Sequence, residues 1–164
     1  MIILKKGKEE DISVIQHLAK RIWPLTYSDY ISADQLDYML DKMYNKGELL
    51  LQFQKGHNFL IAEEDDLDLG FAGFSLFDAE NYIYKLHKLY VLPEAHGKGV
   101  GKLLINEVLN MVRSQGGKSL QLNVNRNNKA AEFYKKAGFK IKETVDLDIG
   151  NGFYMNDYVM ERPV

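Results

Sequence analysis

Three glycines within five residues mark the segment "LYVLPEAHGKGVGKLL", residues 89–104. A glycine has no Cβ, so the chain can turn sharply there and a ligand can lie directly against the backbone. The segment runs from an apolar, strand-like stretch into an amphipathic helix, whose first N–H groups lack partners and whose dipole is positive at this end. The glycines are Gly97, Gly99 and Gly101, with Lys98 and Lys102 between and after them. These features predict a binding site for an anion, phosphate above all.

Two common phosphate-binding loops do not match this segment. A Walker A loop needs glycine where His96 stands and serine or threonine where Leu103 stands. The dinucleotide fingerprint would place its third glycine at Lys102. Both motifs also follow a parallel strand, whereas the residues before this loop have the pattern of a hairpin. A nucleotide-binding α/β protein of another kind is therefore a weaker interpretation.

The remaining reactive residues narrow the chemistry. The chain has no cysteine, which excludes disulfides, thiolate metal sites and an acyl-cysteine intermediate. Its four histidines are scattered without the spacing of metal ligands, so we expect no metal. The formal charge of −2 gives no general reason to expect nucleic acid or a membrane surface as a partner. No run is long enough to span a bilayer, and the first residues do not form a signal peptide, so we expect a cytoplasmic protein.

The hydrophobic pattern predicts the elements that position the loop. We expect a first strand in "IILKK", a helix from Glu9 that Pro24 ends at Trp23, and a second helix that Ser32 caps. A short helical piece follows, and then the period changes to that of strands. "NFLIAEE" and "GFAGFSLF" predict a hairpin around the acidic turn "DDLDL", and "YIYKLHKLYVL" predicts a third long strand.

The second half of the chain continues the alternation. We expect a helix over about residues 99–115, a strand in "SLQLNV", a short helix ending at Gly138, and two closing strands that turn through Gly150–Gly152. This order predicts an α/β (α+β) fold with a mixed, mostly antiparallel sheet of about seven strands and helices on both faces. No linker, repeat or low-complexity stretch divides the chain, so we expect one domain over residues 1–164.

The glycine loop and its surroundings resemble the GCN5-related N-acetyltransferase (GNAT) family. "HGKGVG" is similar to that family's [Q/R]-x-x-G-x-[G/A] pyrophosphate loop, with His96 in place of Gln or Arg. "LQLNVNRNNKAAEFYKKAGF" resembles the family's next strand and its N-x-x-A-x-x-x-Y-x-x-x-G-F element. The two helices before the hairpin also agree, so the resemblance covers nearly the whole chain, and its strongest motifs lie in residues 86–139. It implies a transferase that uses acetyl-CoA.

The resemblance implies a role for each matching residue at the cofactor. The fourth strand would offer backbone groups to pantetheine and to the acetyl carbonyl, and the loop would offer N–H groups to the pyrophosphate. His96 would support the loop, although a surface histidine without a role explains it equally well. One asparagine of a neighbouring pair would contact CoA while the other caps the short helix. These cofactor-binding residues are Leu89, Tyr90, Val91, His96, Gly97, Lys98, Gly99, Val100, Gly101, Lys102 and one of Asn127 and Asn128.

The resemblance also implies the acid of the reaction and leaves the base open. Tyr134 matches the family's tyrosine near the CoA sulfur, where a phenol with a pKa of about 10 can protonate the leaving thiolate. An interfacial tyrosine without a catalytic role is the alternative. Many members have a glutamate on the fourth strand, and this chain has none there. His87 lies at a suitable point to act as the base, and a chain of water molecules is the other option.

Charge is unevenly distributed along the chain. Residues 126–142 hold six Lys or Arg and one acid, so part of this segment would meet the 3′-phosphate of CoA unless it is a solvated helix face. Residues 24–41 hold four aspartates among tyrosines and no base. In the family this region borders the acceptor, so the segment resembles that of bacterial polyamine-acetylating (PaiA-like) members. The alternative, a wet face of an amphipathic helix, fits the spacing slightly better.

The sequence therefore predicts direct transfer of an acetyl group from acetyl-CoA to a primary amine in a ternary complex. A small cationic amine or polyamine is favoured as acceptor, before a peptide N-terminus or a lysine. A non-catalytic acyl-CoA-binding or sensor domain on the same fold is the alternative. By analogy with the family, the long final strand can form a homodimer.

Overall fold

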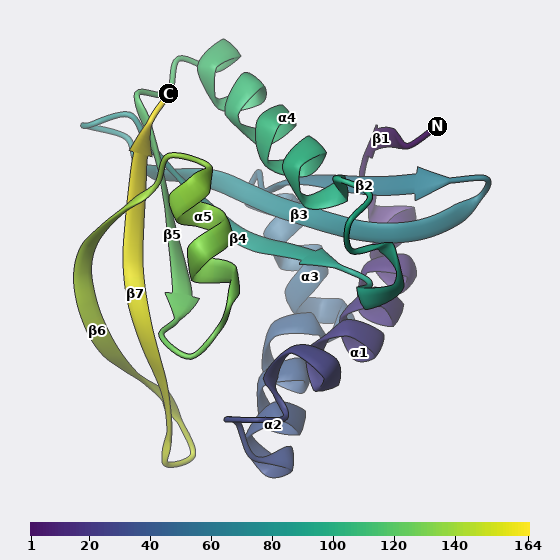
Figure 1. Ribbon diagram of the computed structural model, residues 1–164, viewed down its shortest axis with the longest axis vertical. Coiled ribbons are helices and arrows are strands. Elements are labelled where there is room, and N and C mark those ends of the chain that lie inside the picture. The colour runs from purple at the N-terminus through teal and green to yellow at the C-terminus, as the bar shows by residue number, and fades with distance from the viewer. The chain divides into compact units, whose positions relative to one another are not determined.

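The computed structural model describes all residues 1–164 and contains seven strands and five α-helices. Figure 1 shows the elements with their labels. They divide between two compact units, Met1–Ser75 with Lys88–Val108 and Leu76–His87 with Leu109–Val164. We describe each unit by itself, and the prediction of one domain over the whole chain stays a prediction. No helix is both long and apolar enough to cross a membrane.

The first unit contains the N-terminal helices and one part of the sheet. Its strands are β1 (Ile3–Lys6), β2 (Asn58–Glu64), most of β3 (Leu67–Asp78) and the end of β4 (Ile83–Val91). Its helices are α1 (Ile12–Tyr27), α2 (Ala33–Tyr44), α3 (Lys46–Gln54) and the start of α4 (Val100–Ser114), and short 3-10 turns occupy Glu9–Asp11 (η1) and Pro93–Ala95 (η2). β1 pairs antiparallel with β2, and β2 pairs antiparallel with β3. The predicted hairpin is confirmed, with Asp65 and Asp66 at positive φ in its turn.

Aromatic side chains pack the three helices α1–α3 onto one face of these strands. Ile61 lies opposite Phe71, and Phe59 lies opposite Gly73, so these residues share a face. Phe53 of α3 stacks on Phe59 with ring centroids 4.6 Å apart, and Tyr44 of α2 meets the edge of Phe71 at 6.1 Å. Burial of such large rings supplies much of the packing energy of a small unit.

The second unit contains the C-terminal strands. The start of β4 pairs in parallel with β5 (Ser119–Asn125), which pairs antiparallel with β7 (Phe153–Pro163). β6 (Lys140–Gly150) and β7 form the long hairpin visible in Figure 1, and the helix α5 (Ala130–Lys136) joins β5 to β6. β4 contributes to both units. The strand order is β1-β2-β3-β4-β5-β7-β6. One parallel pair among antiparallel ones confirms the predicted mixed sheet.

The structure confirms the predicted start of α2 but not the predicted end of α1. Ser32 does cap α2, because its side chain accepts a hydrogen bond from the N–H of Gln35 at 3.1 Å. The prediction that Pro24 ends the first helix is wrong, since α1 continues to Tyr27. A proline in a helix interior leaves the carbonyl four residues earlier without its donor. That residue is Lys20, which is exposed, so water can satisfy its carbonyl.

Candidate functional site

The glycine loop lies at the surface, between η2 and α4. Gly97 and Gly99 have φ angles of 86° and 78°, in the left-handed region that favours glycine. No atom lies within 4 Å of a Cβ built at either position, so the requirement for glycine comes from the backbone and from any ligand. Residues 96–99 are exposed, while Val100, the first residue of α4, is buried. The loop therefore presents its main chain to solvent at a helix start that is itself firmly packed.

The backbone N–H groups of the loop are partly committed. The N–H of Lys98 donates to Ala95 at 3.3 Å, and the N–H of Leu103 donates to Gly99 at 3.0 Å. The N–H groups of Val100, Gly101 and Lys102 belong to the first turn of α4, where the helix offers no acceptor. This is the donor arrangement that an anion at a helix N-terminus requires.

Lys98 is paired with a carboxylate from a neighbouring strand. Its Nζ lies 3.3 Å from Oε1 of Glu64, at the end of β2. Oε2 of the same carboxylate lies 3.4 Å from the N-terminal ammonium. The hydrogen bond from Lys98 holds the pKa of Glu64 below its usual value, and the N-terminal ammonium acts in the same direction. The loop lysine is thus present where an anion would bind, and it already has an anionic partner.

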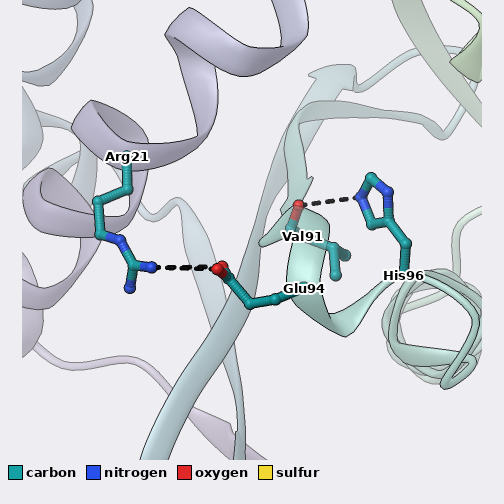
Figure 2. Close-up of polar contacts among 4 residues, drawn as sticks. All are labelled: Arg21, Val91, Glu94 and His96. Carbon is teal, nitrogen blue, oxygen red and sulfur yellow. Dashed lines mark hydrogen bonds and ion pairs between the residues drawn. The ribbon is translucent and has the colours of Figure 1, made fainter.

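The side chain of His96 contacts the last residue of β4, the strand that leads into the loop. Its Nε2 lies 3.2 Å from the carbonyl oxygen of Val91, as Figure 2 shows, so Nε2 must carry the proton that it donates. In the same figure Arg21 of α1 contacts Glu94 of η2, with Nη2–Oε distances of 3.3 and 3.4 Å. The contact with Val91 supports the predicted structural role of His96. The contact between Arg21 and Glu94 connects α1 to the segment before the loop.

The end of β4 lies unusually close to β3. A Cβ at Gly70 would come within 2.6 Å of the carbonyl oxygen of Tyr90 and within 3.1 Å of the Cα of Val91. Leu89, Tyr90 and Val91, the residues predicted to face pantetheine, are all partly exposed. The absence of a side chain at Gly70 therefore sets the position of this part of β4.

Tyr90 also joins an aromatic cluster with α1. Its hydroxyl lies 2.9 Å from that of Tyr27, and its ring lies 5.6 Å from Trp23 and 5.7 Å from Phe71. The cluster faces the helical side of the first unit. It provides a rigid support for the backbone of β4 at the residues predicted to bind the cofactor.

In the second unit, Tyr134 is 7% exposed on α5. Its ring meets the edges of Phe133 and Phe139 at 5.3 and 5.7 Å. Burial raises the pKa of the Tyr134 phenol well above its usual value. The hydroxyl thus stays protonated across the physiological range, as a proton donor must.

The two asparagines next to α5, Asn127 and Asn128, form different hydrogen bonds. The Asn128 side chain accepts a hydrogen bond from the N–H of Ala130 at 2.9 Å, at the start of α5. Asn127 is exposed, and its N–H donates to the Asn125 side chain at 2.9 Å. The Asn128 side chain therefore satisfies the first N–H of α5, and Asn127 stays the candidate for the predicted contact with CoA.

The other predicted residues are at the surface. His87 is exposed on β4. The four aspartates of residues 24–41 are all exposed, as the wet face of a helix requires. In the basic segment, Arg126 pairs with Asp146, Lys135 with Glu132 at 3.1 Å, and Lys142 with Glu161 at 4.0 Å. Salt bridges at the surface neutralise part of the patch, and the remaining lysines are solvated.

Sequence reasoning missed a buried lysine on β4. Lys88 is 7% exposed, and its Nζ donates to Oε1 of Gln52 at 2.8 Å. The rings of Tyr44 and Phe59 flank the ammonium at 5.5 and 5.7 Å, and Nε2 of Gln52 donates to Glu48 at 3.0 Å. Burial lowers the pKa of Lys88 to about 8. Its position in the strand, two residues from the buried Leu86, was the available signal.

A buried acid on β7 was also missed. Asp157 is 1% exposed, and its Oδ2 accepts a hydrogen bond of 3.4 Å from Nδ2 of Asn123. Asp157 stands two residues before the buried Val159, so the alternation of the strand places a carboxylate where an apolar residue is expected. That departure from the pattern is visible in the sequence.

Comparisons with known proteins identify the family of this chain. Residues 55–141 match the model of the acetyltransferase (GNAT) domain. An uncharacterized N-acetyltransferase of Mycobacterium bovis is 30% identical over 93% of this chain and 97% of its own length. The spermidine N(1)-acetyltransferase of Thermoplasma acidophilum is 28% identical over 90% of this chain and 93% of its own. The chain therefore belongs to the GNAT acetyltransferase family.

A solved structure supports the same assignment. The PaiA N-acetyltransferase of Thermoplasma acidophilum, crystallised with coenzyme A, superposes with a TM-score of 0.83 and 27% identity. The match covers 100% of this chain and 99% of that one. The protein is an acyltransferase, an acetyl-CoA-dependent N-acetyltransferase of the GNAT type. This confirms the predicted family, fold and class of enzyme, and favours them over a binding domain without activity.

Proposed function

We propose that the protein transfers the acetyl group of acetyl-CoA directly to a primary amine of a small cationic molecule, in a ternary complex. The observation that carries this proposal is the exposed glycine loop at the start of α4, in a chain that resembles a spermidine acetyltransferase over 90% of its length. The exposed aspartates of α2 form no enclosed acidic site, so the argument for a polyamine comes mainly from that relative.

The residues of the loop fit the diphosphate of the cofactor. The N–H groups of Val100, Gly101 and Lys102 would donate to it, and Lys98 and Lys102 would add charge. Gly97 and Gly99, which the positive φ angles favour, have no side chains that could obstruct the ligand. Backbone donors of this kind lose no side-chain entropy on binding. Leu89, Tyr90 and Val91 would present main-chain groups to pantetheine, and Asn127 would contact CoA.

The reaction would proceed by direct attack. The nitrogen of the neutral amine bonds to the thioester carbonyl carbon, the carbon–sulfur bond breaks, and the thiolate takes a proton from the phenol of Tyr134. The nitrogen loses its extra proton to a base, for which His87 and a chain of water molecules remain the candidates. Without any cysteine, the chain cannot form an acyl-cysteine intermediate.

A panel of amines assayed for thiol release from acetyl-CoA tests the acceptor class. We expect spermidine and related diamines to be better acceptors than neutral or acidic amines. A preference for acidic or neutral acceptors would contradict the proposed substrate class, and no thiol release with any amine would contradict the proposed reaction.

The role of Tyr134 is tested with Tyr134→Phe. General acid catalysis typically contributes between 10² and 10⁴ in rate, so we expect kcat to fall by roughly a hundredfold or more while acetyl-CoA affinity is kept. Tyr154→Phe, at a tyrosine of β7 that is 51% exposed, is the matched control and should change neither quantity. An unchanged kcat in Tyr134→Phe would remove this role.

A further inference from the structure

One face of the second unit carries a row of polar side chains. On one side of β4, β5 and β7, most of the residues that lie opposite one another are polar: Lys85 opposite Gln121, Gln121 opposite Glu161, and Asn125 opposite Asp157. The exception is Val159, which lies opposite Asn123. Hydrogen bonds from Gln121 to Glu161 and from Asn123 to Asp157 confirm that these side chains share a face. We call this surface the polar sheet face.

The two acids of the polar sheet face have different environments. Oε1 of Glu161 accepts hydrogen bonds from Ser119 at 3.2 Å and from Gln121 at 3.1 Å, and Oε2 lies 4.0 Å from Lys142. Asp157 is more deeply buried and has one long hydrogen bond, from Asn123, while its Oδ1 has no partner. A buried carboxylate oxygen without a donor is costly, and native proteins rarely keep one without a use.

The neighbouring cations do not donate a hydrogen bond to Oδ1 of Asp157. The guanidinium of Arg126 forms an ion pair with Asp146 instead. The ammonium of Lys85 lies over the ring of Phe77, 4.8 Å from its centroid. Both cations attract the carboxylate electrostatically and oppose the effect of burial, yet burial still raises the pKa of Asp157. The acid is thus held in place with a free oxygen.

A second unpartnered oxygen lies beside the first. Oδ1 of Asn123 is buried without a hydrogen bond, while Nδ2 of the same amide donates to Asp157. Together the two side chains present two free acceptor oxygens, beside the second N–H of the Asn123 amide. The guest that suits such a pair is a group with several N–H donors and no acceptor, which describes a primary ammonium.

We propose that Asp157 and Asn123 receive a primary ammonium group of the acceptor, distinct from the neutral amine that attacks the thioester. This inference rests on the proposed function and names the residues that recognise its substrate. Asp157 is buried, whereas Asn123, which contacts it, and Asn125, which lies opposite it on β5, are only partly buried. A charged hydrogen bond of this kind contributes roughly ten- to a hundredfold in affinity.

The test compares Asp157→Asn with Glu161→Gln, the satisfied acid of the same face. KM for spermidine is measured at saturating acetyl-CoA, and binding of spermidine to the complex with CoA is measured by calorimetry. We expect Asp157→Asn to weaken both by at least about tenfold, with coenzyme A affinity unchanged, and Glu161→Gln to change neither. The melting temperature of Asp157→Asn should stay equal or rise, because a neutral amide of the same size is easier to bury than a carboxylate.

The outcomes separate this inference from the proposed function. If the wild type acetylates amines and Asp157→Asn keeps its KM, the unpartnered oxygens hold only water and the inference is wrong, while the proposed function stands. If spermidine binds through Asp157 but is never acetylated, the inference stands and the proposed function fails. No binding of spermidine to the wild type would contradict the inference. A lower melting temperature of Asp157→Asn with unchanged amine binding would show that Asp157 has a structural role instead.

Discussion

At the scale of single residues, the most unusual environment is that of Lys88. Its ammonium is enclosed by Gln52 and by the rings of Tyr44 and Phe59, which compensate only partly for lost hydration. Its pKa is lowered from 10.5 to about 8. Below pH 8 the folded protein therefore carries a buried charge that it would hold more easily when unfolded.

This shift predicts how stability depends on pH. Between pH 8 and the ordinary pKa of lysine the unfolded chain binds the proton that the native chain has released, so the free energy of unfolding rises with pH. For this one group the rise is about 1.5 kcal/mol from pH 8 to pH 9.5, before tyrosines begin to ionise. Denaturant unfolding at several pH values should show the rise in the wild type.

The comparison variant is Lys88→Met, which removes the titrating group and keeps a side chain of similar length. The pH-dependent rise should disappear in Lys88→Met and persist in Lys20→Met, at an exposed lysine of α1. Equal slopes in the wild type and Lys88→Met would mean that Lys88 is hydrated in solution.

At the scale of elements, the junction between η2 and α4 forms the proposed anion site, and its glycines can be tested with a matched control. Gly99 and Gly56 both have positive φ, 78° and 89°, and neither would meet an atom within 4 Å as alanine. Alanine in this conformation costs roughly 1–2 kcal/mol at either position. Gly56 lies after α3 and takes no part in the proposed site.

We expect Gly99→Ala and Gly56→Ala to lose similar amounts of stability, whereas only Gly99→Ala should bind coenzyme A more weakly. A loss on the order of tenfold, equivalent to about 1.4 kcal/mol, would follow from small displacements of the loop N–H groups. Calorimetric titration with coenzyme A measures it. If both variants bind coenzyme A like the wild type, the loop does not hold the diphosphate.

The elements also show what the sequence could predict. Hairpins, helix starts and the glycine loop were predictable because alternation, capping residues and glycines act locally, as Ser32 demonstrates. The end of α1 was not, because whether Pro24 stops a helix depends on whether water reaches the carbonyl of Lys20. The partners of Lys98, Lys88 and Asp157 lie 34 to 36 residues away, so no local pattern could reveal them.

At the scale of the whole molecule, the small net charge of −2 leaves recognition to local features. Acetyl-CoA should then stabilise the protein through its site alone. At a free concentration of about 100 times Kd, the free energy of unfolding should rise by roughly 2.7 kcal/mol. For a chain of this size that corresponds to a Tm increase of roughly 5–10 °C.

Thermal unfolding with and without the cofactor measures this increase. Pantetheine, which lacks the diphosphate, should produce a much smaller one at the same concentration. Equal shifts with both compounds would place the main binding energy on the strand β4 and not on the loop.

The pairing of Lys98 with Glu64 has a consequence for how the cofactor arrives. In the proposed site, the diphosphate would meet a lysine that the carboxylate of Glu64 already holds. Cofactor entry would then exchange one anion for another at Lys98, and the carboxylate of Glu64 would keep the N-terminal ammonium, 3.4 Å away, as its counter-ion. Without a cofactor, the charge of Lys98 is thus balanced by a carboxylate of the neighbouring strand β2.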